Sequence, residues 1–229
     1  MTDAIAIEVW SDIACPWCYI GKRNLERGIA SRGADAPEVR VTYRSFELAP
    51  DTPVDFEGGE ADYLAAHKGV DAATAQQMLE RVTGVAADAG LEYRFDLLHH
   101  TNTVKAHQLL HYAKERGRQH EMSERLMAAY FTEGRHLGRD DELVSLAVEI
   151  GFDADDVRAA LEQETHLESV RADQAQAAAY GISGVPFFVI DGAYGVSGAQ
   201  PPEAFSQILD QVWRERVDDE PAEPEPRSA

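Results

Sequence analysis

The chain has 229 residues, of which 44% are hydrophobic, and these values predict one or two globular domains with a buried core. Its formal net charge is −20, from 41 acidic and 21 basic residues. A surface this acidic argues against nucleic acid and anionic membranes as partners, because it offers few cations to phosphate groups. No apolar run approaches the length of a membrane span and no secretory signal is recognisable, so we expect a cytoplasmic location.

The chain contains only two cysteines, Cys15 and Cys18. A short apolar strand is predicted over residues 4–10 and a helix after it, so the pair lies where a strand leads into a helix. Pro16 suits the first helical turn, which places Cys15 at the helix tip, where free backbone N–H groups favour a thiolate. Cys18 lies one turn further in. We therefore expect Cys15 to be the nucleophile and Cys18 the resolving thiol of a redox-active disulfide.

A zinc site is the alternative interpretation of this cysteine spacing. Zinc would need two further ligands, which His107 and His111 could supply from one helical turn. They follow about 90 residues later, whereas compact zinc fingers use spacings of about 12 to 15 residues. In a reducing compartment, a Cys-x-x-Cys pair is more often catalytic or metal-binding than a structural bond. We therefore predict no metal and a disulfide that opens and closes.

The chain begins with a βαβ pattern, whose second strand is predicted over residues 37–48 and should be parallel to the first. Residues 60–181 show helical patterns and no convincing strand. A hairpin over residues 184–198 and an amphipathic helix over residues 201–216 follow. The helices predicted between the two halves cover residues 71–89, 102–117, 121–133, 140–150, 154–161 and 162–180.

This order predicts an α/β fold that is interrupted in its middle. Residues 1–59 and 166–217 are expected to form the two parts of one domain, and residues 60–165 a helical insertion domain. Residues 218–229 are rich in proline and acidic residues and lack an apolar anchor. We therefore predict a disordered acidic tail over this last segment.

The sequence resembles the thioredoxin-fold, DsbA-like oxidoreductases, and within them the FrnE-type branch without an export signal. The resemblance covers nearly the whole chain, up to about residue 216. It implies a thioredoxin fold with a large all-helical insertion between the βαβ half and the ββα half. It also implies a cis Val185–Pro186 bond beside Cys15, whose exposed backbone would pair with a substrate chain. The segments that carry it are residues 11–18 (SDIACPWC), 46–50 (FELAP), 102–107 (NTVKAH) and 181–186 (GISGVP).

The motif residues suggest supporting roles around the two thiols. Pro16, Val185 and Pro186 are expected to support the active site or bind substrate. Trp17 is expected to be an exposed aromatic residue that shields the disulfide and contacts partners. Glu47 is either a proton relay for Cys18, if it is buried, or a charge that faces solvent.

Three further residues lie at matching positions or next to the dithiol. Asp12 is expected to order the turn before the helix. Asn102 and His107 match family positions and could touch substrate. Helix capping would equally explain Asn102, and helix packing or a helical surface would explain His107.

Two functions are compatible with these residues. The first is a thiol–disulfide oxidoreductase or isomerase that acts on protein or small-molecule thiols and disulfides. The alternative is a glutathione-dependent isomerase or kappa-class-like glutathione transferase acting on a small aromatic, polyketide-like substrate. Because those relatives typically carry serine at the nucleophile position and no second cysteine, the intact pair favours the first. We expect no cofactor beyond the redox-active disulfide, with glutathione as a candidate cosubstrate, and a homodimer is left open.

Overall fold

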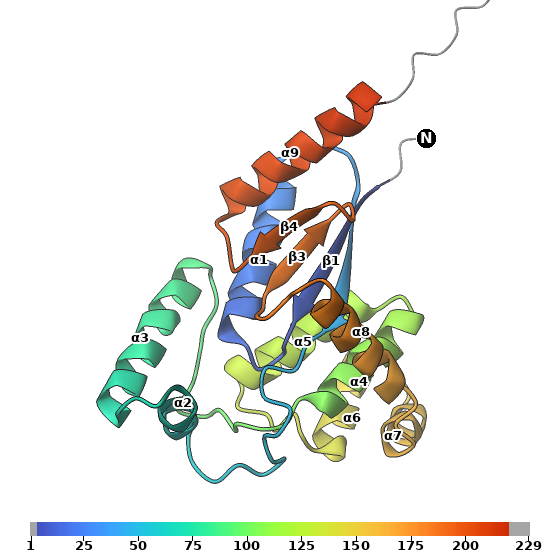
Figure 1. Ribbon diagram of the computed structural model, residues 1–229. Helices are drawn as coiled ribbons and strands as arrows, with labels where there is room; N and C mark the ends of the chain where they lie inside the picture. The colour runs from blue at the N-terminus through green and yellow to red at the C-terminus, as the bar shows by residue number, and fades with distance from the viewer. Residues whose placement is uncertain (1–3, 220–229) are drawn as a thin grey trace, which may run out of the picture.

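The computed structural model describes residues 4–219. At its centre lies a four-stranded sheet with the strand order β2-β1-β3-β4 (Figure 1). The parallel pairing predicted for the first two strands and the antiparallel hairpin predicted for the last two are both confirmed. β3 also pairs antiparallel with β1, so the chain returns to the sheet that it left. The strands are β1 (Ile5–Ser11), β2 (Val39–Ser45), β3 (Phe187–Ile190) and β4 (Tyr194–Ser197).

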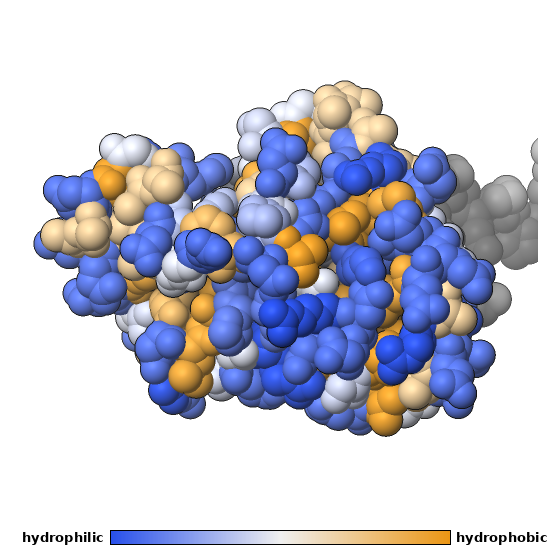
Figure 2. All heavy atoms as spheres, turned by 90° about the horizontal axis from the view of Figure 1, so that it is seen from below, coloured by the Kyte–Doolittle hydropathy of each residue, from blue (hydrophilic) through white to orange (hydrophobic). Residues whose placement is uncertain are grey.

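Residues 4–219 also form nine helices. α1 and α9 pack on each other over one face, whereas α5 and α8 contact β2 on the other side (Figure 1). Figure 2 shows mostly hydrophilic side chains with scattered apolar patches on the face seen from below. The helices are α1 (Pro16–Ser31), α2 (Glu60–Lys68), α3 (Ala72–Asp88), α4 (Val104–Glu115), α5 (Gln119–Phe131), α6 (Asp140–Glu149), α7 (Ala154–Glu162), α8 (Leu167–Ala179) and α9 (Pro202–Asp219).

β1 supplies buried side chains to both faces of the sheet, because successive residues of a strand point in opposite directions. Ile5, Ile7 and Val9 pack in one cluster with apolar residues of α1 and α9. Trp10 packs in a separate cluster with Ala177 of α8. The sheet is therefore covered on both faces, and its central strand fixes the position of the residues that follow it.

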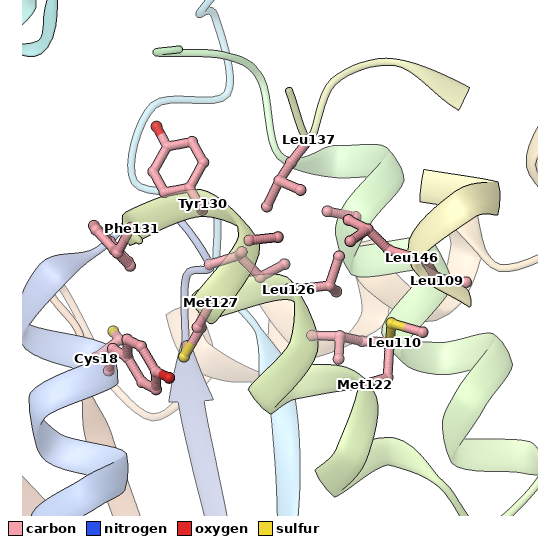
Figure 3. Packing of buried hydrophobic residues seen from close by; sticks show 14 of the residues in the cluster. Cys18, Leu109, Leu110, Met122, Leu126, Met127, Tyr130, Phe131, Leu137 and Leu146 are labelled. Carbon is pink, nitrogen blue, oxygen red and sulfur yellow. The ribbon is translucent and has the colours of Figure 1, made fainter. Parts of the chain in front are cut away.

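A second core fills the helical segment (Figure 3). The large apolar residues of α5 are fully buried there, against residues of α4 and α6. Cys18 belongs to the same cluster. The dithiol therefore lies at the border between the sheet and the helical core. The buried α5 residues are Met122, Leu126, Met127, Tyr130 and Phe131.

Asp173 on α8 joins three parts of the fold and is only 2% exposed. Its carboxylate accepts hydrogen bonds from the backbone N–H of Ser45 and the guanidinium of Arg44, each at 2.9 Å. The Nε2 atom of His111 on α4 lies 3.1 Å from the same carboxylate. Burial alone would raise the pKa of Asp173, but these partners outweigh burial and hold the pKa below its ordinary value. α8, β2 and α4 thus meet at one ionised side chain.

Two features of the helical segment differ from the sequence prediction. α2 was not predicted, because Glu60 is its only buried residue and it has no apolar face to produce a helical period. The helix predicted over residues 162–180 begins only at Leu167. The chain leaves α7 through Glu164, whose φ of 51° is left-handed and interrupts a continuous helix. The other predicted helices agree with the structure within three residues.

The predicted domain boundaries after residues 59 and 165 stay a prediction. α9 reaches Asp219, so the first two residues of the predicted disordered tail are helical, and that part of the prediction is wrong. Residues 220–229 lie outside the described residues. Across residues 4–219, no helix combines the length and apolar character needed to cross a membrane.

Candidate active site

Cys15 occupies the N-cap position of α1, and Pro16 follows at the start of the helix, as predicted. The carbonyl of Cys15 accepts the N–H of Cys18 at 3.0 Å. The backbone oxygen of Pro16 accepts a hydrogen bond from the hydroxyl of Tyr93 at 2.6 Å, which holds the first turn against the helical segment. The local sequence thus places one sulfur at the helix tip and the other a turn inside.

Both cysteines are free thiols, and both are buried, with 4% exposure for Cys15 and 2% for Cys18. Their surroundings differ more than their exposure, since Cys15 borders a cavity and Cys18 packs in the helical core. Burial raises the pKa of the Cys18 thiol well above its usual value, and the neighbouring Cys15 raises it further. Cys18 therefore stays protonated at neutral pH, as suits a thiol that reacts second.

We predict that iodoacetamide labels Cys15 before Cys18 when the reduced protein is treated near neutral pH. Only Cys15 borders open space, and only a thiolate alkylates rapidly. Peptide mapping by mass spectrometry after short exposures gives the order of labelling. Labelling of Cys18 first would contradict the assignment of the two thiols.

The Val185–Pro186 bond is cis and lies beside Cys15, as the resemblance implied. The backbone oxygen of Val185 is 3.7 Å from the sulfur of Cys15, within the range of a weak S–H···O hydrogen bond. Gly21 on α1 permits this close approach, since a Cβ atom there would lie 2.9 Å from Cγ of Pro186. Because Gly21 has no side chain, Pro186 can pack closely on α1, and the Val185 backbone then lies beside the sulfur of Cys15.

Asp12 orders the turn before α1, as expected, and is 2% exposed. Its carboxylate accepts the backbone N–H groups of Ala14 at 3.3 Å and Leu48 at 2.8 Å. Nε2 of His107 lies 3.3 Å from Oδ1 of Asp12, at ion-pair distance but without hydrogen-bond alignment. Burial alone would raise the pKa of Asp12, but His107 and the Leu48 N–H outweigh it and lower the pKa. His107 is therefore a buried neighbour of the turn, not a helix-surface residue.

Asn102 connects the start of α4 with the loop after β2. Its Oδ1 accepts the N–H of Val104 at 2.9 Å, and its Nδ2 donates to the backbone oxygen of Pro50 at 2.9 Å. The first contact satisfies a free backbone donor at the helix start, but Thr103 occupies the N-cap position, so the predicted cap is displaced by one residue. Both contacts of Asn102 are thus structural, and they shape the loop beside the cavity.

Glu47 is 8% exposed, so its interpretation as a solvent-facing charge is wrong. Its Oε1 accepts hydrogen bonds from Arg171 at 2.8 Å and Gln174 at 2.6 Å, both on α8. Among the hydrogen bonds of the described residues, none joins Glu47 to Cys18. These contacts attach α8 to the segment after β2.

The four residues of the zinc alternative do not come together. His107 lies against Asp12, and His111 lies against Ser45 and Asp173. In the part of the chain that the structure describes, no group of three or more histidine, cysteine or acidic side chains is arranged to hold a metal ion.

A cavity of about 400 Å³ opens beside Cys15 and extends from the tip of α1 to α2 and α3. Trp17 lines it and is 40% exposed, as expected for this residue. Leu48 and Met78, 43% and 39% exposed, also line it. The lining is mainly apolar and includes basic side chains of α2 and α3.

Sequence reasoning missed the acid–base pair that anchors α2 at the cavity. Oε2 of Glu60, the first residue of α2, lies 2.9 Å from Nδ1 of His100, and both side chains are buried. The ring of Tyr63 stacks on His100, with 3.4 Å between the ring centroids. The sequence did contain a signal for the start of α2, which is an acidic residue, Asp62, three positions after Gly59. In the structure the Asp62 carboxylate accepts the Gly59 N–H at 2.9 Å.

A buried lysine on α1 joins this helix to α5. Lys22 is 2% exposed, and its ammonium contacts the carboxylates of Glu26 and Glu124. Burial alone would raise the pKa of Glu26, but His120, Lys22 and Arg23 outweigh it and lower the pKa to about 2. The ionised form of Glu26 is therefore the form that the folded protein stabilises.

We predict that the contribution of Glu26 to stability is complete above pH 4.5, its ordinary pKa, and is lost as the pH falls towards about 2. The sign follows because the unfolded chain binds the proton more tightly than the folded chain. Glu26→Gln should flatten the dependence of the melting temperature on pH in this acid range. An unchanged pH dependence in the variant would show that Glu26 does not carry the effect.

Comparison with known proteins identifies the family. Residues 6–210 match the model of the DSBA-like thioredoxin domain. The solved structure of SCO1869 from Streptomyces coelicolor, described as a probable DsbA oxidoreductase, is 42% identical, with a TM-score of 0.86. That match covers 98% of this chain and 95% of SCO1869. The chain belongs to the DSBA-like thioredoxin domain family, and its architecture is a thioredoxin fold with a helical insertion.

Two further relatives span almost the same length. YwbO from Bacillus subtilis (strain 168) is 29% identical over 217 residues, which cover 93% of this chain and 99% of YwbO. The cytosolic disulfide reductase DsbM from Pseudomonas aeruginosa is 17% identical with a TM-score of 0.64, and the match covers 92% of this chain and 99% of DsbM. DsbM has also been solved with GSH. At this identity, DsbM shows a shared fold alone.

Proposed function

We propose that the protein is a thiol–disulfide oxidoreductase or isomerase that cycles between a Cys15–Cys18 dithiol and disulfide. The observation that carries this proposal is the position of Cys15 at the N-cap of α1, where the residue borders a cavity. Cys18 lies one turn inside the helix. The hydrogen bond from its backbone N–H to the carbonyl of Cys15 keeps the two residues next to each other. Membership of the DSBA-like family supports the same chemistry.

The proposed reaction has two exchange steps. The Cys15 thiolate attacks one sulfur of a substrate disulfide, forms a mixed disulfide and releases the other half as a thiolate. Cys18 then attacks the Cys15 sulfur, its proton passes to the departing sulfur, and the internal disulfide closes. Two electrons move from the protein dithiol to the substrate, which leaves as two thiols. The reverse sequence would oxidise a substrate dithiol.

The neighbours of Cys15 have positioning and binding roles in this proposal. Val185 presents its backbone beside the sulfur, where an extended substrate would pair with it. Trp17 at the cavity mouth contacts the partner. Asp12 and His107 fix the turn that holds Cys15.

Titration of the protein against the glutathione redox couple tests the proposal. We expect one reversible two-electron transition between the two cysteines, detected by alkylation and mass spectrometry, and none in Cys18→Ala. A potential near about −270 mV would indicate a reductant, and one well above about −200 mV an oxidant or isomerase. Thiols that stay reduced at every ratio would contradict the proposed function.

The cavity beside Cys15 favours a second candidate, a glutathione-dependent isomerase or transferase for a small aromatic substrate. Such an enzyme needs one group to orient or activate the thiol of glutathione, so Cys18 would be dispensable. Turnover of an aromatic substrate with glutathione by the Cys18→Ala protein would support this candidate against the first.

We also propose a cytoplasmic location, with protein or small-molecule thiols and disulfides as partners. The cytosolic reductase DsbM, solved with GSH, supports both points by its fold. No cofactor other than the dithiol is part of the proposal, and glutathione is its candidate cosubstrate. A homodimer stays a prediction.

A further inference from the structure

The outer wall of the cavity beside Cys15 carries unpaired positive charge. Lys68 at the end of α2 and Arg81 on α3 both line the cavity and are exposed. Within residues 4–219, neither has an ion-pair or hydrogen-bond partner, although most basic side chains of this acidic chain are paired. His67 lines the same cavity, and its ring stacks on that of Tyr63.

The two carboxylates that line the cavity already have partners inside the protein. Asp12 is buried against His107 and two backbone N–H groups. Glu60 is buried against His100. Within residues 4–219, Lys68 and Arg81 have no such partner, so they are the charged groups left to pair with a negative group of a bound molecule.

The size of the cavity and its other lining residues indicate which kind of ligand it can hold. About 400 Å³ lies within the range of small-molecule sites, roughly 300 to 1,000 Å³. The lining also includes Trp17, Leu64 and Val82, which are apolar. A ligand with a sulfur, an apolar group and a negative charge would find a lining partner for each of the three.

We propose that the cavity selects small disulfides and thiols that carry an acidic group beside an apolar or aromatic group. This inference rests on the proposed exchange function and names its substrate class. The ligand sulfur meets Cys15, the apolar group contacts Trp17 and Val82, and the acidic group lies against Lys68 and Arg81. Exchange then follows the two steps given above, with the ligand disulfide reduced to two thiols.

The local charge can act despite the net charge of −20. At physiological salt the Debye length is about 8 Å, so acids elsewhere on the surface are largely screened from a molecule in the cavity. The two cations line the cavity itself and are screened less at contact. Because exposed ion pairs contribute little, we expect about a two- to fivefold effect on rate per cation.

A comparison of two chromogenic aromatic disulfides distinguishes the effect of ligand charge on the rate from the effect of ligand shape. Dithiobis(nitrobenzoate) carries a carboxylate on each ring, whereas dithiodipyridine is neutral near neutral pH. The rate constant of each with the reduced full-length protein is divided by its rate constant with free mercaptoethanol, which removes differences in intrinsic reactivity. The ratio of the two normalised values measures selection for the acidic group.

We expect the double variant Lys68→Gln, Arg81→Gln to lower this ratio by about five- to twentyfold, and Lys68→Arg to keep it. Arg158→Gln is the matched control, because Arg158 is exposed, has no partner within residues 4–219 and lies on α7, away from α2 and α3 (Figure 1). The control should leave the ratio unchanged. Added salt should lower the ratio in the wild type and much less in the double variant.

The outcomes distinguish this inference from the function on which it rests. An equal ratio in wild type and double variant, with thiolate still released, would overturn the substrate class and leave the exchange function standing. If neither disulfide releases thiolate from the wild-type protein, the proposed function fails and the inference fails with it. Because Lys68 and Arg81 are exposed and unpaired, the single variants should fold and report the same trend if the double variant does not.

Discussion

Cys15→Ala should lower the rate of thiol–disulfide exchange by about a thousandfold or more, because it removes the only thiol that borders the cavity. Cys18 remains in this variant but cannot replace it. Its side chain is buried in the helical core, and burial raises its pKa, so it presents little thiolate. The measurement is the rate of thiolate release from a small disulfide by the reduced variant.

Thermal melts must first show that the Cys15→Ala protein folds. This is expected, since the change removes one sulfur at the edge of a cavity and leaves the Cys15 backbone bonds in place. Arg158→Gln is a useful comparison, because it changes an exposed side chain on α7 outside the cavity lining and should retain exchange. Exchange in Cys15→Ala within about tenfold of wild type would contradict the assignment of the nucleophile.

Asp173→Ala should lower the free energy of unfolding by about 3–5 kcal/mol, the usual cost of breaking a buried charge pair. The variant leaves the N–H of Ser45 without its acceptor and separates Arg44 and His111 from their common carboxylate. Because these partners come from β2 and α4, the loss should affect the sheet and the helical segment together. Urea unfolding followed by circular dichroism measures it.

Asp173→Asn is the matched control for this prediction. The amide keeps an oxygen that can accept from the Ser45 N–H but removes the negative charge opposite Arg44 and His111. We expect the free energy of unfolding of Asp173→Asn to lie between those of the wild type and Asp173→Ala. A loss below about 1 kcal/mol for Asp173→Ala would mean that the contacts of Asp173 contribute no more than surface ion pairs do.

The sequence alone was sufficient to predict those features that a short motif or a regular spacing of apolar residues determines. The spacing of Cys15 and Cys18 with Pro16 between them placed both thiols at the start of a helix. The helical pattern over residues 121–133 placed α5 within two residues of its observed bounds. The position of Pro186 beside Cys15 came from a family resemblance, since nothing local in the sequence brings together residues so far apart.

The cavity could not be predicted, because it depends on contacts between distant residues. α2 has no apolar period and is attached through Glu60 and His100, which are forty positions apart in the chain. The burial of Glu47 likewise depends on Arg171 and Gln174, which only the fold brings near. Charged residues that are buried by pairing resemble surface residues in a sequence.

The reaction of dithiobis(nitrobenzoate) with the reduced wild-type and Cys18→Ala proteins decides most directly whether Cys15 attacks and Cys18 resolves. The wild type should release two thiolates per chain and end as an internal disulfide without adduct. Cys18→Ala should release one and retain the other half as a mixed disulfide on Cys15, seen by intact-mass spectrometry and removed by a reductant. A wild-type protein that retains the adduct, or a Cys18→Ala protein that forms none, would contradict the proposed cycle.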